Sequence, residues 1–128
     1  MKSVTITPKK LSGSVSIPPS KSLCHRAIIC ASLAKGISII NNIGNSEDID
    51  KTIEAMKALG AQIKREDTRL IIDGSKTFSV LEPTALDCGE SGSTLRFLIP
   101  LALHCKVPVT YTGKGRLGER PLDSYYQI

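Results

Sequence analysis

The sequence contains no tryptophan, and aromatic residues make up only 4% of its 128 residues. Because single-stranded nucleic acids bind largely by stacking their bases on aromatic rings, this scarcity argues against such a partner. No lysine-arginine block compensates for it, although the net charge of +5 favours anionic partners in general. We therefore expect no nucleic acid partner, and a basic nucleic-acid module stays only as an alternative hypothesis.

The chain also has few groups that bind metals. Its four cysteines show no Cys-x-x-Cys spacing and are accompanied by only two histidines, so no metal site is predicted. Cys24 and Cys30 fall within a predicted helix, where both are expected to be buried. The apolar run from Phe97 to Leu103 is interrupted by Pro100 and is too short to cross a bilayer, and no signal peptide is visible. These absences predict a reduced, cytoplasmic protein with no membrane association.

Hydrophobic periodicity predicts an ordered series of elements in the first half of the chain. Alternating residues indicate strands over Val4–Thr7 and Val15–Ile17. A helix is then predicted at 23–34, a strand at 37–43, a second helix at 47–59 and a hairpin at 61–72. The second of these helices has Asn45-Ser46 as its capping signal. Residues 14–73 thus have the order strand, helix, strand, helix, strand, strand.

A second, similar series begins after this unit. It consists of a strand at 85–88, a helix at 93–104 and a strand at 107–111, and Arg96 stands 70 residues after Arg26. Glu119 to Leu122 is predicted to open another helix, with Pro121 in its first turn. Because the second series stops partway, we interpret the chain as a piece of a longer protein or as a shortened version of one.

The residues with most chemical potential lie where the first helix begins. Ser20-Lys21-Ser22 precedes Arg26, and Ser22 and Arg26 share one helix face because they are four residues apart. A hydroxyl, an ammonium and a guanidinium beside free backbone N–H groups suit a phosphate or a carboxylate. The alternative is that Ser20 only caps the helix while both cations are solvated.

A second anion site is predicted where the second series enters its helix. Gly92 allows close approach of a ligand to the backbone, and Ser93 or Thr94 could cap the helix or donate to the ligand. Glu90 is unusual in an anion site, so it is expected to pair with Arg96 or with a substrate hydroxyl.

Two further features complete the candidate site. The segment from Lys114 to Arg120 combines cations with glycines and forms either a third anion-binding element or a solvated loop. His25 is expected to point off the face of the first cluster. We expect the cations at the two helix ends to hold two acidic small molecules in one crevice.

In combination, these segments resemble the amino-terminal part of the 5-enolpyruvylshikimate-3-phosphate synthase family. The resemblance rests on Pro-x-Ser-Lys-Ser followed by Arg26, on Gly-x-Ser-Gly-x-x-x-Arg ending at Arg96, on Arg120-Pro-Leu and on Ser46-Glu-Asp. It covers essentially the whole chain. The related enolpyruvyl transferase that acts on UDP-N-acetylglucosamine is less similar, because its lysine is typically followed by asparagine rather than by Ser22.

The resemblance implies an α+β fold of two lobes, each with three copies of a βαβαββ unit and with the active site between them. Here residues 14–84 would form one complete unit and residues 85–128 an incomplete second unit. Residues 1–13 would form an opening strand that is associated with the other lobe and is loose in this chain. Family members usually act as monomers.

The implied reaction transfers the enolpyruvyl group of phosphoenolpyruvate to the 5-hydroxyl of shikimate 3-phosphate, without metal or organic cofactor. By position, Lys21 would touch both substrates, Ser22 and Arg26 would bind shikimate 3-phosphate, and Gly92 and Arg120 would bind phosphoenolpyruvate. The acid-base residues would lie in units absent here, so this chain alone is expected to be inactive. A stand-alone phosphate-binding domain without catalysis is the remaining alternative.

Overall fold

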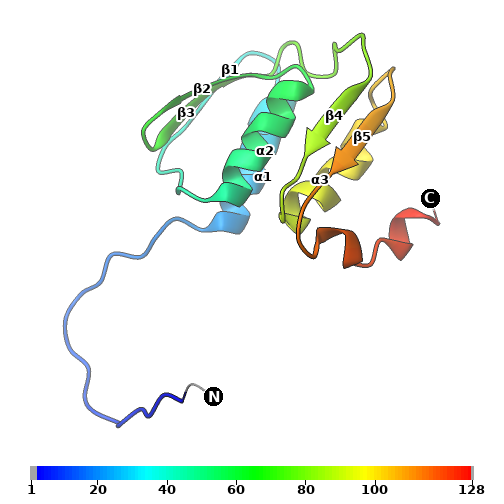
Figure 1. Cartoon of the computed structure of the whole chain (residues 1–128). Coiled ribbons are helices and arrows are strands. Elements are labelled where there is room, and N and C mark those ends of the chain that lie inside the picture. Colours follow the sequence, from blue (N-terminus) through cyan, green and yellow to red (C-terminus); the bar gives the residue numbers. More distant parts are fainter. Residues whose placement is uncertain (1–2, 128) are drawn as a thin grey trace.

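The computed structural model describes residues 3–127 (Figure 1). Residues 1 and 2 of the expected opening segment, and Ile128, lie outside the described residues. The helices are α1 (Lys21–Leu33), α2 (Glu47–Ala58) and α3 (Gly92–Ala102), followed by the short 3₁₀ turns η1 (Leu117–Glu119) and η2 (Asp123–Tyr125). The strands are β1 (Ile37–Ile40), β2 (Gln62–Glu66), β3 (Arg69–Asp73), β4 (Thr84–Asp87) and β5 (Val109–Thr112). None of the helices formed by these residues has the length and apolar composition needed to cross a membrane.

The strands form two small sheets. Strands β1, β3 and β2 make an antiparallel sheet in that spatial order, and α1 and α2 lie side by side against it (Figure 1). Strands β4 and β5 pair in parallel, with Leu86 opposite Tyr111, and α3 crosses from one to the other. This mixture of antiparallel hairpin and parallel β-α-β confirms the predicted α+β class.

Serine side chains start all three α-helices. The hydroxyls of Ser20, Ser46 and Ser91 accept the backbone N–H three residues further on, at 3.4, 3.3 and 3.2 Å respectively. After α1 and α2 the chain turns through Gly36 and Gly60, whose φ angles of +92° and +106° suit glycine. The caps predicted before α1 and α2 are therefore confirmed, whereas α3 is capped by Ser91 and not by the residues expected.

One core connects the two helices with both sheets. The predicted apolar stripe of α2 is buried in it and meets the inward residues of β3, β4 and α3. Its fully or almost fully buried members include Ile28, Ile49, Ile53, Met56, Leu59, Leu70, Ile72, Leu86 and Leu98.

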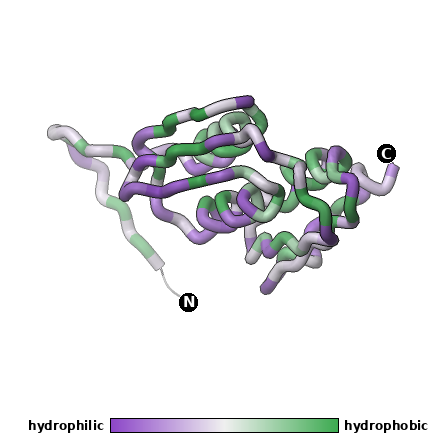
Figure 2. Tube along the Cα trace, turned by 90° about the horizontal axis from the view of Figure 1, so that it is seen from above, coloured by the Kyte–Doolittle hydropathy of each residue, from purple (hydrophilic) through white to green (hydrophobic). Residues whose placement is uncertain are grey.

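The two strands predicted before α1 are not formed. Residues 3–19 have no strand partner and run away from the body of the molecule, with hydrophobic and hydrophilic stretches along them (Figure 2). Val4 and Ile17 are 88% and 84% exposed. Alternation alone cannot make a strand, because a strand needs a neighbour for its backbone hydrogen bonds and a surface for its apolar face. Within residues 3–127, α1 is therefore the first regular element.

Three local predictions are also wrong. Cys30 is exposed, because it lies on the solvent side of α1, whereas Cys24 is buried as expected. No helix opens at residues 119–122: Arg120 is extended (φ −76°, ψ 134°) because a residue before proline disfavours the helical conformation, and Pro121 lies between η1 and η2. Strand β1 ends at Ile40 rather than Ile43, since Asn42 has a φ of 59°.

A buried polar chain links the three α-helices. Nδ1 of His25 in α1 lies 2.7 Å from Oγ1 of Thr52 in α2, which lies 2.7 Å from Oγ1 of Thr94 in α3. Thr94 in turn donates to Oγ of the cap residue Ser91 at 2.7 Å. All four side chains are buried, so we name this set the hydroxyl chain. Buried polar groups that satisfy one another fix one arrangement of the elements that carry them.

Burial lowers the pKa of His25 below its ordinary value of 6.5. The Asp48 carboxylate on α2 opposes this effect, while Lys21 and Arg26 on α1 add to it. The folded protein therefore holds this imidazole neutral at a pH where the unfolded chain already protonates it.

This shift predicts a pH dependence of stability. As the pH falls below 6.5, the unfolded chain binds a proton at His25 that the folded chain does not bind, so the free energy of unfolding decreases. Urea denaturation from about pH 8 to about pH 5, the range in which histidine titrates, measures this slope. His25→Asn should flatten it and His104→Asn, at an exposed position, should not; a slope unchanged in His25→Asn would contradict the prediction.

Gly74 predicts a second effect on stability. A Cβ at this position would lie 2.3 Å from the carbonyl oxygen of Ala34 and 2.4 Å from that of Ser32, both of which are backbone atoms that cannot turn aside. Gly74→Ala should lower the free energy of unfolding by about 1–3 kcal/mol in denaturant titration. Gly118→Ala is the matched control, since nothing lies within 4 Å of its added methyl group. Equal stability of the two variants would contradict the packing described.

Candidate anion-binding site

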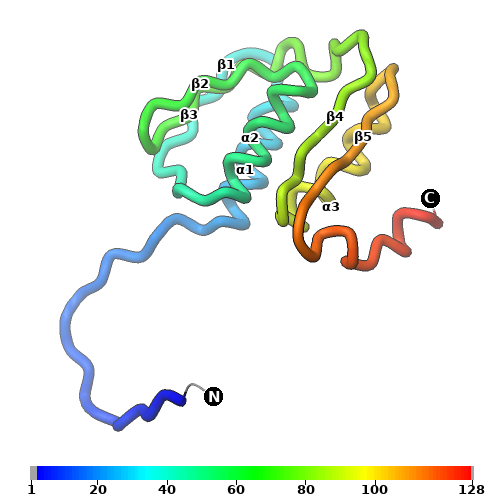
Figure 3. The backbone as a smooth tube through the Cα atoms, in the orientation of Figure 1, coloured from blue at the N-terminus to red at the C-terminus, as the bar shows by residue number. Residues whose placement is uncertain are grey.

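The N-terminal ends of α1, α2 and α3 lie at the same end of the molecule, where β4 and β5 also end (Figure 3). The hydroxyl chain holds these three ends together. Each helix start presents backbone N–H groups without intrahelical partners, and the helix dipoles add partial positive charge there. One end of the fold therefore gathers the groups that favour anions.

The three helix starts differ in charge. The first turn of α2 contains Glu47, Asp48 and Asp50, which occupy its positive end. The first turns of α1 and α3 contain no acidic residue. The positive ends of α1 and α3 are thus not occupied by acidic residues of their own first turns, and their role as anion sites stays a prediction.

At the α1 end, the predicted residues are held by neighbours on other helices. Lys21 Nζ lies 2.7 Å from Asp48 Oδ2 of α2, and its side chain is 57% exposed. Arg26 donates to the backbone carbonyl of Ser22 at 3.2 Å. The Arg26 guanidinium also lies 5.2 Å from the centre of the Phe97 ring of α3, which orients it by a cation–π contact. The turn that contains Ser22 and Arg26 is therefore in contact with α3.

At the α3 end, Arg120 packs directly against Gly92. A Cβ on Gly92 would lie only 2.7 Å from Nη1 of Arg120, so the guanidinium occupies the space that glycine leaves open. A hollow of about 380 Å³ is lined here by Arg96, Arg116, Glu119, Arg120 and Pro121. Three guanidinium groups against one carboxylate make this hollow positively charged, and Glu119 is paired with Arg116 at 3.1 Å.

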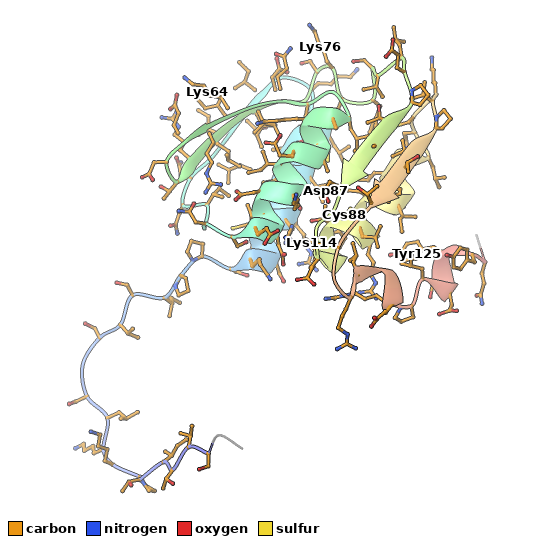
Figure 4. The ribbon with its side chains drawn as sticks, in the orientation of Figure 1. Lys64, Lys76, Asp87, Cys88, Lys114 and Tyr125 are labelled. Atoms are coloured by element: carbon orange, nitrogen blue, oxygen red, sulfur yellow. The ribbon has the colours of Figure 1, made fainter. Side chains whose placement is uncertain are left out.

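The C-terminal turns close over α3 through backbone groups. Arg96 donates to the carbonyl of Pro121 at 3.3 Å, and the hydroxyl of Tyr125 donates to the carbonyl of Arg96 at 3.1 Å. Figure 4 shows Tyr125 in this last turn. These contacts keep the segment that bears Arg120 beside the start of α3.

The predicted residues fall into two neighbouring groups. Gly92 and Arg120 lie together at the α3 end, whereas Lys21 lines a smaller hollow of about 150 Å³ beside Pro18, Pro19 and the turn before α2. The two helix ends adjoin, but Lys21 and Arg120 line different hollows. A single crevice for two ligands therefore stays a prediction.

Glu90 does not pair with Arg96, one of the two partners expected for it. The Glu90 carboxylate lies over Gly115, where an added Cβ would overlap it. Arg96 donates to the carbonyl of Pro121 instead. Glu90 is thereby directed toward the loop after β5. Contact with a substrate hydroxyl stays a prediction.

Ion pairs surround the ends of the parallel strands. Lys51 lies 2.5 Å from Asp87 and lowers the pKa of that carboxyl, and Glu47, 2.6 Å from Lys114, raises the pKa of that ammonium. Figure 4 shows Asp87, Cys88 and Lys114 together at this end. Burial raises the pKa of Cys88 to about 11, so its thiol stays protonated at neutral pH and is unsuited to act as a nucleophile. The ion pair between Lys114 and Glu47 links the loop after β5 to α2.

Sequence reasoning missed the residues that join the helix ends. The sequence pattern assigns no role to Thr52, places His25 off the face of the first cluster and includes Phe97 only in an apolar run. Their partners are 27 to 42 residues away in the hydrogen bonds of the hydroxyl chain, so no local spacing indicates the contacts. The one available signal was a histidine on the inward face of an apolar helix.

Comparisons with known proteins agree with the motifs. Residues 6–127 match the family model described as EPSP synthase (3-phosphoshikimate 1-carboxyvinyltransferase). The chain is 58% identical over 128 residues to a 3-phosphoshikimate 1-carboxyvinyltransferase of Clostridium perfringens and 54% identical to that of Clostridium kluyveri. It is covered completely in both comparisons and spans about 30% of the length of these curated relatives.

The fold gives the same result. The structure of EPSP synthase from Acinetobacter baumannii aligns with a TM-score of 0.78 at 26% sequence identity, covering 90% of this chain and 26% of that chain. Since the family model extends over nearly all of the residues, the chain belongs to the EPSP synthase family.

Proposed function

We propose that the chain supplies the anion-binding part of an enzyme that makes 5-enolpyruvylshikimate 3-phosphate in the shikimate pathway. In the addition, the 5-hydroxyl oxygen of shikimate 3-phosphate loses its proton and bonds to C2 of phosphoenolpyruvate, while C3 gains a proton, giving a tetrahedral intermediate. In the elimination, the bond from C2 to the phosphate oxygen breaks, C3 loses a proton, the C2–C3 double bond forms again and phosphate is released. The observation that carries the proposal is the seating of Arg120 against Gly92 at a helix start without acidic residues.

Phosphoenolpyruvate is assigned to the α3 end. A helix N-terminus provides backbone donors, and a guanidinium provides two parallel donors that match a carboxylate or a phosphate. Arg120 supplies the guanidinium directly beside the backbone of Gly92. The hollow next to them, with Arg96 and Arg116, is large enough for a small anion.

Shikimate 3-phosphate is assigned to the α1 end, to Lys21, Ser22 and Arg26. Lys21 is exposed, and its ion pair with Asp48 is of the surface kind that contributes at most about 1 kcal/mol. A phosphate can therefore replace Asp48 as its partner. In this arrangement Lys21 lies between the two substrates, where its charge offsets the repulsion between two polyanions.

The bond-making step needs acid-base groups that we do not assign within this chain. We expect them in the part of the enzyme that corresponds to the remaining length of the relatives, of which this chain spans about 30%. The isolated chain should accordingly bind anions without turning over the two substrates.

Arg120 provides the first test. In a chimera, residues 1–128 replace the matching segment of the Clostridium perfringens relative, which is 58% identical. Arg120→Ala should raise the KM for phosphoenolpyruvate by about 10- to 100-fold, as expected when a charged hydrogen bond is lost, in an assay of phosphate release. Lys76→Ala is the matched loss of a cation, because Lys76 lies at the opposite end of the molecule (Figure 4). Similar KM values in both variants would remove Arg120 from the site.

Arg26 provides the crossed test. Arg26→Ala should weaken shikimate 3-phosphate binding by about 10- to 100-fold in calorimetry of the same chimera, while leaving the KM for phosphoenolpyruvate much less affected. Arg120→Ala should show the reverse pattern. If both variants weaken both ligands equally, the assignment of one substrate to each helix end is wrong.

A further inference from the structure

One atom of the hydroxyl chain has no partner. Nε2 of His25 is buried and forms no hydrogen bond. Among the side chains of residues 3–127, it is the one buried nitrogen or oxygen atom without a hydrogen-bond partner. The proposed function gives no role to this imidazole, although it follows the Lys21-Ser22 pair and directly precedes Arg26. A fully buried histidine with one nitrogen engaged and one free requires an explanation, because such groups are normally satisfied.

The contacts of Thr94 and Thr52 give the direction of the hydrogen bonds. Thr94 has a single hydroxyl proton, which it donates to Ser91 Oγ at 2.7 Å. The Thr94 oxygen then accepts from the Thr52 hydroxyl, for which Thr94 at 2.7 Å is a closer acceptor than the Asp48 carbonyl at 3.3 Å. The Thr52 oxygen in turn accepts from Nδ1–H of His25 at 2.7 Å.

The reverse direction is less favourable. It would place the ring proton on Nε2, where a buried N–H would have no acceptor. Buried N–H groups without partners are rarer in proteins than acceptors with unused capacity. With the proton on Nδ1, the unpartnered atom is only a lone pair.

We propose that His25, neutral and protonated at Nδ1, is a positioning residue that sets the start of α3 relative to α1 through Thr52, Thr94 and Ser91. The chain of donors begins beside Arg26 and ends at the cap that precedes Gly92. It is a continuous polar connection between the two anion-binding ends. Its effect on substrate binding rests on the proposed function, whereas the hydrogen-bond direction does not.

The imidazole itself gives the first test, on the 128-residue chain without substrates. ¹⁵N–¹H correlation spectra of the histidine ring should show the proton of His25 on Nδ1 at neutral pH. Thr52→Val, which keeps the shape but removes the acceptor, should shift the Nδ1 resonance and speed amide exchange at Thr94, whose N–H donates to Ser91. Thr77→Val is the control, since Thr77 donates to the carbonyl of Ser32 and is not part of the hydroxyl chain. A proton on Nε2 in the wild type would overturn the proposal.

Kinetics of the chimera give the second test. His25→Asn retains a side-chain N–H that can donate to Thr52, while His25→Leu fills the space without a donor. We expect Thr52→Val and His25→Leu to raise the KM for phosphoenolpyruvate about 10-fold with kcat changed less than 3-fold, and His25→Asn to restore most of the loss. Equal KM values in His25→Asn and His25→Leu would overturn the positioning role. An inactive unmutated chimera would instead count against the proposed function and leave the spectroscopic result standing.

Discussion

Three helix starts are held at one end of this fold by a buried run of side-chain hydrogen bonds, and the candidate site depends on that constraint. Helices α1, α2 and α3 each contribute one member, His25, Thr52 and Thr94, at contacts of 2.7 Å. Because these groups are buried, sliding one helix along another would leave a polar atom unsatisfied, which is costly in a nonpolar interior. The apolar core brings the helices together, and the polar chain selects their relative position.

The three helix ends that the hydroxyl chain holds together differ in charge. The acidic first turn of α2 occupies its own positive end and supplies Asp48 to Lys21 and Glu47 to Lys114. The first turns of α1 and α3 contain no acidic residue, so the positive ends of these two helices are not occupied by carboxylates of their own. At the α1 end, an incoming anion would compete with Asp48 for Lys21. Under the proposed function, each of the two anionic ligands has its own helix end, and the exposed Lys21 lies at the α1 end.

Packing of glycine against arginine is the second constraint on the site. Gly92 leaves room for the Arg120 guanidinium, and the segment that bears Arg120 is kept in place by Arg96 and Tyr125 through backbone carbonyls. The segment with the two 3₁₀ turns therefore holds the Arg120 side chain in position and does not open a further helix. The family relationship covers this segment as well, since the family model extends to residue 127.

The sequence by itself determined the features that depend on near neighbours in the chain. The caps of α1 and α2, the buried stripe of α2, the hairpin of β2 with β3 and the β-α-β order around α3 all follow from spacings of a few residues. The motifs around Lys21, Gly92 and Arg120 were recognisable for the same reason. Only the tertiary structure decided that residues 3–19 form no strand, that Arg120 packs on Gly92, and that His25 joins Thr52 and Thr94. Strand pairing and buried polar contacts depend on which distant segments become neighbours, and such long-range contacts leave no periodic signal in the residues that make them.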